Sequence, residues 1–328
     1  MLANGSETIA VVVVTYNSVR YIPDLIESLE PGLRGVRWHL TVADNASADN
    51  TVDVVRAHAP YARIVQTGRN GGYAAGINTA VAAADRHDAV LVLNPDIRLA
   101  PDCGRELLAA LRRNRAGIAV PRLSNGDGTF SPSLRREPSI LRALGDAVLG
   151  GNRAGRFERL GEVITDEERY REETAVDWAE GSIMLIDRRC WETCGPWDES
   201  FFLYSEETEY ALRARDRGFV TVFAPRAAAR HLGGESRKSP PLWALLTLNR
   251  VRLYRRRHPL PSTTGYWAIL LLREASRAAT GNTCSRAAAR ALLDGTRVLT
   301  TPDADTGDEP AVMSQAARAL MPERNQDH

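Results

Sequence analysis

The first 120 residues alternate between short apolar runs and longer segments with helical spacing. Residues 9–14 form an unbroken β-branched run, which is typical of a parallel strand buried on both faces. Residues 19–29 carry apolar side chains at intervals of three and four, which predicts a helix. The same alternation predicts further strands at 38–43, 62–66, 89–93 and 117–121, and helices over 49–58, 73–84 and 105–113. This order indicates an α/β domain with a parallel sheet and right-handed crossovers.

The pattern changes after residue 123. A turn cluster at 124–128 is followed by a weakly patterned stretch rich in Arg and Glu over 135–175, which we expect to be helix and loop. Residues 176–186 resemble a strand interrupted at Gly181-Ser182, residues 208–217 a helix, and residues 220–223 a strand. Two helices are predicted between 242 and about 298. The polar residues from 300 onward are predicted to be disordered.

Composition narrows the class of protein. The chain has 328 residues and a net charge of +1, so it is not a globally basic nucleic-acid-binding protein. No stretch reaches the 18 to 20 apolar residues of a membrane span, and the N-terminus lacks the features of a signal peptide. Its four cysteines form no C-x-x-C pair, which favours reduced thiols over zinc ligands. We therefore expect a cytoplasmic protein.

Polar clusters follow the predicted strands. Thr15-Tyr16-Asn17 follows the first strand, Asp44-Asn45 the second, and Asn94-Pro95-Asp96 the fourth. A turn explains each cluster alone. The carboxyl ends of parallel strands, however, meet at one edge, where ligands bind in such sheets. The stretch GRNGGYAAGIN (68–78) follows the third strand and opens a helix, so its free N–H groups suit an anion such as phosphate.

Six motifs in one order produce a family resemblance. They are VVVVTYNS (11–18), VADNASADNT (42–51), NGGYAAGIN (70–78), LNPDI (93–97), WDESFFLYSEETEYALRARDRG (197–218) and APRAAARHLGGES (224–236). In these motifs the chain resembles the inverting GT-A glycosyltransferases of family 2, in the branch of bacterial rhamnosyltransferases. The resemblance implies a GT-A fold, Rossmann-like, with a mostly parallel sheet, flanking helices and additional C-terminal helices.

The resemblance also implies a division of the chain. A catalytic domain would span 1–236, with a nucleotide-sugar-binding half at about 9–122 and an acceptor half at about 123–236. A basic helical segment would follow at 237–299, and a tail at 300–328.

Site residues are carried over from the matching motifs. Asp44 would accept the imide N–H of the nucleotide base. Asp96 would be the last carboxylate of the D-x-D motif, with Asn94 in the place of its first Asp, and His231 would complete the metal site. The cation would be Mg²⁺ or Mn²⁺, both of which accept such ligands. The implied nucleotide-sugar-binding residues are Thr15, Tyr16, Asn17, Asp44, Asn45, Gly71, Gly72, Tyr73, Asn78 and Asn94.

The pair Glu206-Glu207 stands where the family has Glu-Asp. Inverting transfer needs one base for the acceptor hydroxyl, and Glu207 is our first choice, with Glu206 left open. A plain alternative is that acidic residues favour helix N-termini. Trp178, Gly181 and Ser182 fall where relatives present the acceptor. His231 could also be a partly buried structural histidine.

A basic segment follows the last motif. Between Glu235 and Glu274 there are eight Lys or Arg and no acidic residue. It could be an interfacial helix on the inner face of the cell membrane, or a packed helix with a solvated basic face.

The implied function is metal-dependent inverting transfer of a sugar. The favoured donor is dTDP-L-rhamnose, and the acceptor a polyprenyl-diphosphate sugar or a growing surface glycan. Transfer of galactofuranose or a hexose, a non-catalytic sugar-nucleotide-binding protein and a nicotinamide-dependent oxidoreductase are the alternatives. The last lacks the G-x-G-x-x-G fingerprint after the first strand.

Overall fold

The computed structural model describes residues 7–233 and 239–294, which form two compact units. The first unit contains residues 7–137, 163–199 and 206–233, and the second contains 138–162, 200–205 and 239–294. The second unit thus includes two segments that the division by sequence assigns to residues 1–236.

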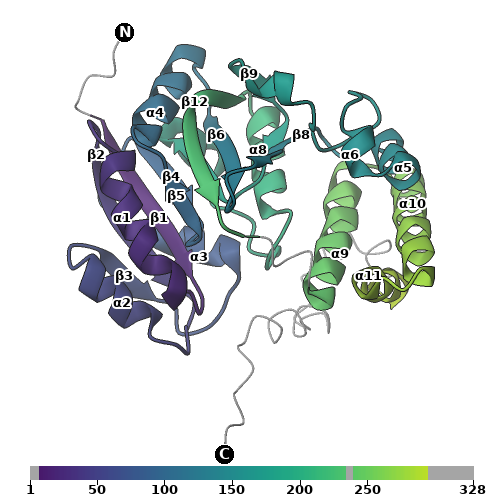
Figure 1. The fold of residues 1–328 in the computed structure, drawn as a ribbon, viewed down its shortest axis with the longest axis horizontal. Helices are drawn as coiled ribbons and strands as arrows, with labels where there is room; N and C mark the ends of the chain where they lie inside the picture. Colours follow the sequence, from purple (N-terminus) through teal and green to yellow (C-terminus); the bar gives the residue numbers. More distant parts are fainter. Residues whose placement is uncertain (1–6, 234–238, 295–328) are drawn as a thin grey trace, which may run out of the picture. The chain divides into compact units, whose positions relative to one another are not determined.

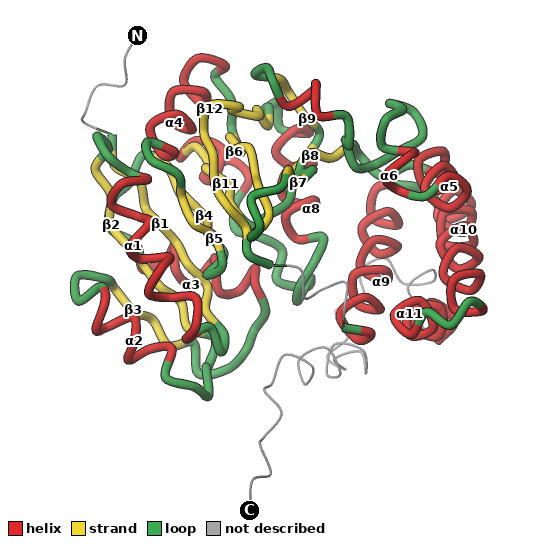
Figure 2. Tube along the Cα trace, in the orientation of Figure 1, coloured by secondary structure: helices red, strands yellow, loops and turns green. Residues whose placement is uncertain are grey.

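The first unit is built on a mixed, mostly parallel sheet of ten strands (Figures 1 and 2). The main path runs β3-β2-β1-β4-β11-β6-β12-β5, with β7 paired to β6 and β9 paired to β12. Strand β11 is antiparallel to both of its neighbours, β4 and β6. A separate pair joins β8 to β10. The strands are β1 (Thr8–Thr15), β2 (Arg37–Asp44), β3 (Arg63–Gln66), β4 (Ala89–Leu93), β5 (Ile97–Leu99), β6 (Ile118–Asn125), β7 (Phe130–Ser131), β8 (Leu134–Arg135), β9 (Thr174–Val176), β10 (Trp178–Ala179), β11 (Ile183–Asp187) and β12 (Thr221–His231).

Helices cover both faces of this sheet, which explains the unbroken apolar run of β1. Alternate β1 residues, Ile9, Val11 and Val13, pack with α1, α2 and α4. Val12 and Val14 pack with α3, α7 and α8 on the other face. Figure 1 shows α1 and α4 in front of the sheet. The helices are η1 (Val19–Tyr21), α1 (Ile22–Gly32), α2 (Thr51–His58), α3 (Tyr73–Ala83), α4 (Cys103–Asn114), η2 (Glu167–Tyr170), α7 (Arg188–Cys194) and α8 (Glu206–Asp216).

Several predicted boundaries need correction. Strand β12 continues to His231, well beyond the predicted end at 223, and its pairing with β6 shifts register between Ala224 and Ala228. The prediction stopped early because Pro225 and the alanines that follow do not read as a strand. Helix α8 begins at Glu206. Helix α2 begins at Thr51, whose N–H donates to Asp49 Oδ1 at 3.0 Å, although Asn50 occupies the N-cap position.

The second unit is helical. Its helices are α5 (Ile140–Leu149), α6 (Gly151–Ala154), α9 (Pro240–Arg257), α10 (Leu260–Ala279) and α11 (Thr283–Asp294). The prediction of two helices between 242 and 298 was wrong, because the chain breaks twice within this range. Pro259 follows α9 after one residue, His258, and Gly281 adopts a φ of +95° before α11. The predicted tail at 300–328 lies outside the described residues.

Helix α9, the main part of the basic segment, is packed within the second unit. Arg250 forms an ion pair with Glu162. The guanidinium carbons of Arg252 and Arg256 lie 5.1 and 4.7 Å from the ring centre of Phe201. Arg237 and Lys238 lie outside the described residues. Across the ranges that the structure describes, we find no helix that combines the length and apolar character needed to cross a bilayer.

Candidate active site

At the ends of β1 and β2, the carboxylate of Asp44 accepts hydrogen bonds from Thr15 and Ser47. Thr15 Oγ1 donates to Asp44 Oδ1 at 2.8 Å, and the N–H of Ser47 donates to Asp44 Oδ2 at 2.9 Å. Asp44 is 1% exposed. Asn17 lies beside it, because its N–H donates to Ser47 Oγ at 2.9 Å, and half-buried Tyr16 connects Asn17 to Thr15. The residues of β1 and β2 that are predicted to bind the nucleotide base therefore lie together.

The glycines before α3 join this edge. Asn45 Nδ2 donates to the carbonyl of Gly72 at 2.8 Å, and Gly72 adopts a φ of +90°, which favours glycine. Gly71 precedes it, and Tyr73 begins the helix. Asn78 lies elsewhere: its amide donates to the carbonyl of Trp197 at 2.9 Å and accepts from the N–H of Trp197 at 2.8 Å.

Asp96 and His231 meet because β5 pairs with the end of β12. Ile97 lies opposite His231 in this antiparallel pair. Asp96 Oδ2 is 3.2 Å from His231 Nε2, and His231 Nδ1 is 2.8 Å from Glu180 Oε1. Burial lowers the pKa of His231, but the hydrogen bonds to Asp96 and Glu180 outweigh it and raise this pKa to about 10. The imidazole therefore bridges two carboxylates.

Two residues of this site were not predicted from the sequence. Glu180 follows β10, and Arg135 lies on its partner strand β8, with its guanidinium 3.9 Å from Glu180 Oε2. The only sequence signal for Glu180 is its place directly before Gly181-Ser182, which interrupts the strand pattern.

The predicted acceptor residues line the same edge from β10 and β11. Ser182 accepts a backbone hydrogen bond from Asn94 at 2.8 Å, which joins the start of β11 to the end of β4. Trp178 is only 8% exposed, and its indole N–H donates to the carbonyl of Arg136 at 3.0 Å. Trp178 is therefore largely enclosed by its own sheet.

Glu206 and Glu207 open α8 after two residues with positive φ, Tyr204 and Ser205. Glu206 is 3% exposed, whereas Glu207 is only partly buried. A Cβ placed on Gly181 would approach Glu207 Cβ to 2.7 Å, so this close contact requires glycine. The two candidates for the base thus differ in access to solvent.

The charge environment of Glu207 is unusual for a carboxylate. Burial raises the pKa of Glu207 to about 7, the negative charge of Glu180 adds to this effect, and Arg135 opposes it. Among the described residues, Glu207 Oε2 has no hydrogen-bond partner. Tyr73 lies nearby: burial raises the pKa of its phenol, and the charges of Glu206, Asp96 and Glu207 contribute. Asp96, a candidate metal ligand, therefore shares one electrostatic environment with Glu206 and Glu207, the candidates for the catalytic base.

The fit of a cation to this site can be judged from the side chains of Asp96 and His231. Among the described residues there is no group of three or more His, Cys, Asp and Glu arranged to hold a metal. Asp96 Oδ2 and His231 Nε2 do converge beside Gly233, where a Cβ would lie 2.7 Å and 2.8 Å from these two atoms. An oxygen and a nitrogen donor fit a cation that takes its remaining ligands from substrate phosphates and water.

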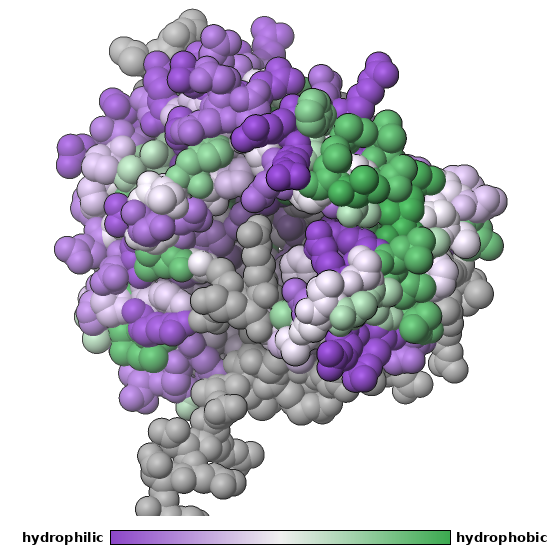
Figure 3. All heavy atoms as spheres, turned by 45° about the vertical axis from the view of Figure 1, so that its right-hand side comes forward, coloured by the Kyte–Doolittle hydropathy of each residue, from purple (hydrophilic) through white to green (hydrophobic). Residues whose placement is uncertain are grey.

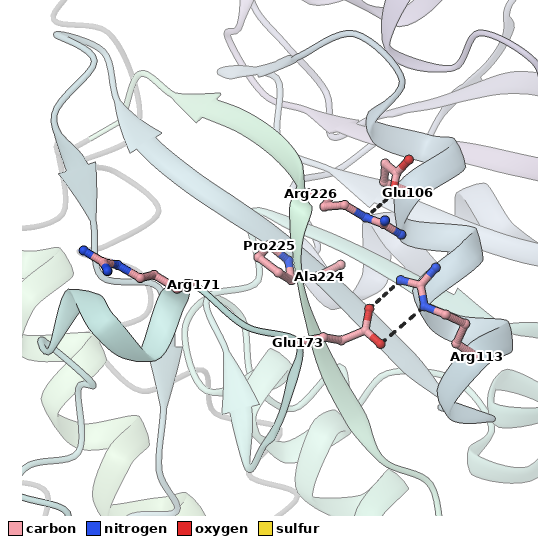
Figure 4. Close-up of a pocket in the computed structure, with 7 residues that line it drawn as sticks. All are labelled: Glu106, Arg113, Arg171, Glu173, Ala224, Pro225 and Arg226. Atoms are coloured by element: carbon pink, nitrogen blue, oxygen red, sulfur yellow. Dashed lines mark hydrogen bonds and ion pairs between the residues drawn. The ribbon is translucent and has the colours of Figure 1, made fainter.

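A separate cavity of about 420 Å³ lies among α4, β9 and the irregular part of β12 (Figure 4). Its charged side chains are mostly paired: Arg113 with Glu173 at 2.5 Å, and Arg226 with Glu106 at 2.9 Å. Figure 4 shows Arg171 apart from both pairs. None of the predicted site residues lines this cavity.

Comparison with known proteins adds to this geometry. The family model "Glycosyl transferase family 2" matches residues 10–164. The N-acetylglucosaminyl-diphospho-decaprenol L-rhamnosyltransferase of Mycobacterium tuberculosis is 32% identical over 69% of this chain and 76% of that protein. The low-salt glycan biosynthesis hexosyltransferase Agl10 of Haloferax volcanii is 29% identical over 64% of this chain and 62% of that protein.

A solved structure shows the same fold. The mannosyltransferase PcManGT of Pyrobaculum calidifontis, in complex with GDP-Man and Mn²⁺, matches 95% of this chain and 80% of its own chain, with a TM-score of 0.54 and 17% identity. The mixed sheet with helices on both faces is thus the GT-A fold, as expected. Together with the rhamnosyltransferase relative, which is matched over three quarters of its length, this establishes that the chain is a glycosyltransferase and belongs to glycosyltransferase family 2.

Proposed function

We propose that this protein is a metal-dependent inverting glycosyltransferase. It transfers L-rhamnose from dTDP-rhamnose to a polyprenyl-diphosphate sugar or a growing surface glycan. One observation carries this proposal. Asp96, which contacts His231, and Glu207 both act on the buried phenol of Tyr73, and the pKa of the partly buried Glu207 is raised to about 7. The mycobacterial rhamnosyltransferase, named for a lipid-linked acceptor, supports the choice of sugar and acceptor.

In this proposal Asp44 recognises the nucleotide base. Its carboxylate is held by Thr15 and Ser47 and still has lone pairs to accept the imide N–H of thymine. The glycines before α3 allow the backbone to approach the diphosphate, and the free N–H groups of that helix favour its negative charge.

Asp96 and His231 would hold Mg²⁺ or Mn²⁺. The cation would neutralise charge on the departing nucleoside diphosphate. Glu180 orients His231, because its contact with Nδ1 leaves Nε2 to face Asp96. The mannosyltransferase PcManGT, which shares the fold, is described in complex with Mn²⁺, and this supports the use of a divalent cation.

Glu207 is the proposed base. Its deprotonated carboxylate takes the proton of the acceptor hydroxyl as that oxygen attacks the anomeric carbon. The bond from the anomeric carbon to the diphosphate oxygen breaks on the opposite side, so the configuration inverts. A pKa near 7 suits this role, because the carboxylate is then available at neutral pH and still holds a proton well.

A second candidate function is transfer of another sugar, such as galactofuranose or a hexose. The archaeal hexosyltransferase relative favours it. The same residues would bind metal and act as base, and only the sugar pocket would differ.

Calorimetric binding tests both candidates. We would titrate the protein with dTDP-rhamnose, UDP-galactofuranose, UDP-galactose and UDP-N-acetylglucosamine, each with Mn²⁺ and with EDTA. We expect dTDP-rhamnose to bind only with Mn²⁺, and Asp96→Ala to abolish this dependence. Metal-dependent binding of a UDP-sugar alone would favour the second candidate. Equal binding in EDTA would refute the metal site.

A further inference from the structure

Helix α5 of the second unit turns its large apolar side chains outward. Leu141, Leu144 and Val148 are 47%, 46% and 73% exposed, whereas Ala143 and Gly145 face inward and are buried. An amphipathic helix normally buries its large apolar residues and exposes its polar ones. The arrangement of α5 is the reverse, and it calls for a partner.

Backbone packing fixes this orientation. A Cβ on Gly145 would lie 2.2 Å from the carbonyl oxygen of Leu160, so this position of α5 has room for no side chain. Asp146, 6% exposed, is also on the inward side, in the electrostatic environment of Arg250 and Glu162. Rotating the leucines inward would break this packing and expose the buried side chain of Asp146.

The apolar surface extends beyond α5. Ile140 packs near Gly265 of α10, whose Cβ would lie 3.6 Å from Ile140 Cδ1, and on α10 Leu272 is 71% exposed. Figure 3 shows a continuous apolar area on the side of the second unit that carries α5 and α10. Of the eleven large apolar side chains that are exposed in the described part of the chain, nine belong to this unit. The exposure is therefore concentrated and not scattered, which marks an interaction site.

Exposed basic side chains follow α5 along the chain. Arg153, Arg156 and Arg159 are exposed and flank Phe157, which is 55% exposed. Within the described ranges these three arginines form no ion pair, and Glu158 is the single carboxylate between residues 147 and 161. The described residues of the second unit contain thirteen arginines and five carboxylates, whereas the first unit has 24 basic and 29 acidic residues. The partner should therefore be apolar and anionic together.

We propose that this surface docks on an anionic phospholipid bilayer. The α5 face, defined as Ile140, Leu141, Leu144, Val148, Leu149 and Phe157, inserts at the boundary between headgroups and acyl chains, and the three arginines contact headgroup phosphates. Amphipathic helices that lie in the membrane plane combine these two features. The α5 face lies outside the basic segment at 237–273 indicated by the sequence, whose helix α9 is packed within the unit, although the apolar surface extends to Leu272 of that segment. The proposal does not rest on the identity of the donor sugar or of the base.

Vesicle flotation of the full chain tests this proposal. We would use vesicles of phosphatidylcholine with and without 30% phosphatidylglycerol, at low and high salt. We expect binding to the anionic vesicles that weakens with salt, since screening reduces contacts with headgroups. Replacing Arg153, Arg156 and Arg159 with Ala should lower the partition coefficient about a hundredfold, since each basic residue near such a surface contributes about fivefold.

Matched variants separate the surface from general effects. Leu144→Ser with Val148→Ser should abolish flotation, while Val220→Ser, at a 43% exposed apolar residue of the first unit, should leave it unchanged. Arg34, Arg37 and Arg86 replaced with Ala remove equal charge from the first unit and should have little effect. Circular dichroism confirms folding of each variant.

Two results would overturn the proposal. One is absence of flotation of the natural sequence, or flotation that the α5 variants do not change. The other is a dimer in sedimentation velocity that Leu144→Ser with Val148→Ser dissociates while vesicle binding persists, which would assign the face to a second copy of the chain. Donor binding, measured separately by calorimetry, reports on the proposed function and not on this surface.

Discussion

Two charges of opposite sign, on Glu180 and Arg135, act on the carboxyl group of Glu207. Burial is the main cause of its raised pKa of about 7, Glu180 raises this pKa further, and Arg135 lowers it. In the proposed mechanism only the deprotonated form accepts the acceptor's proton, so we expect kcat/KM to rise as the pH increases through about 7.

Two neutralising substitutions should move this pH profile in opposite directions. Glu180→Gln removes a negative neighbour, so the pKa of Glu207 falls and the rising limb of kcat/KM moves to lower pH. Arg135→Gln removes a positive neighbour and moves it to higher pH. The quantity to compare is the pH at which kcat/KM rises, and not the maximum rate. Glu180 also contacts His231, so its loss can reduce the maximum rate. Shifts of the same sign would contradict this account.

Substitution of the proposed base, Glu207, separates binding of the donor from the chemical step. Glu207→Gln preserves the size of the side chain and should lower kcat by about 10²- to 10⁴-fold while the affinity for the donor stays unchanged. Glu206→Gln is the matched control at the neighbouring buried position. If Glu206→Gln abolishes transfer and Glu207→Gln does not, the roles of the two residues are exchanged.

At the scale of elements, Gly181, which precedes β11, is packed tightly against Glu207 in the first turn of α8. A Cβ on Gly181 would lie 2.7 Å from Glu207 Cβ, so Gly181→Ala must displace the start of α8. We expect a large loss of kcat with a thermal midpoint lowered by only a few degrees, measured by kinetics and calorimetry. Gly151→Ala is the control, since a Cβ there meets nothing within 4 Å. Unchanged activity in Gly181→Ala would show that Glu207 does not need its present position.

One buried ion pair joins two elements of the second unit. Glu162 follows the α5–α6 segment, and Arg250 lies in the middle of α9. Glu162→Gln removes the carboxylate that is paired with this buried guanidinium and should cost about 3 kcal/mol of unfolding free energy. Glu168→Gln, which breaks the exposed pair with Arg171, should cost less than about 0.5 kcal/mol. Urea denaturation compares the two variants, and equal effects would mean that burial of the first pair adds nothing.

Strands with continuous apolar runs could be predicted from the sequence, because burial on both faces leaves no polar interruption. The strand Ala89–Leu93 is an example. The second half of β12 could not, since its alanines and Pro225 carry no strand preference and only pairing with β6 and β5 holds them extended. Helix α5 was expected only as part of a weakly patterned stretch, although its own apolar residues recur at helical spacing.

The site residues divide in a similar way. Asp96, His231 and Glu207 each lie in a motif, so the family resemblance indicates them. Glu180 and Arg135 lie in no motif. They reach the site through the pairing of β8 with β10 and act through charge, which depends on distances that a sequence does not contain.

For the whole molecule, the small net charge of +1 does not reflect the net charges of the two units, which have opposite sign. The described residues of the first unit carry an excess of acidic groups, and those of the second an excess of arginine. A protein with evenly distributed charge would bind weakly to any charged matrix near its isoelectric point of about 7.7.

Ion-exchange chromatography at pH 7 and low salt checks this difference. We expect retention on a cation exchanger despite the small net charge, because local patches bind the matrix. Replacing Arg153, Arg156 and Arg159 with Ala should lower the salt concentration needed for elution. The same change at Arg34, Arg37 and Arg86 should have a smaller effect. Passage of the natural protein without retention would show that the two charge excesses do not act as separate patches.

Arg135, at the end of β8, forms an isolated antiparallel bridge with Val163, and this has a consequence for how such a protein can diversify. Between these two residues the chain forms α5 and α6 and no strand. The interval 136–162 is therefore a segment whose two ends are held side by side. Such an interval can be lengthened, shortened or exchanged with little entropic cost and without rethreading the sheet. Grafting it between relatives offers a way to alter where the enzyme works while the carboxyl ends of β1, β2 and β4 keep their arrangement.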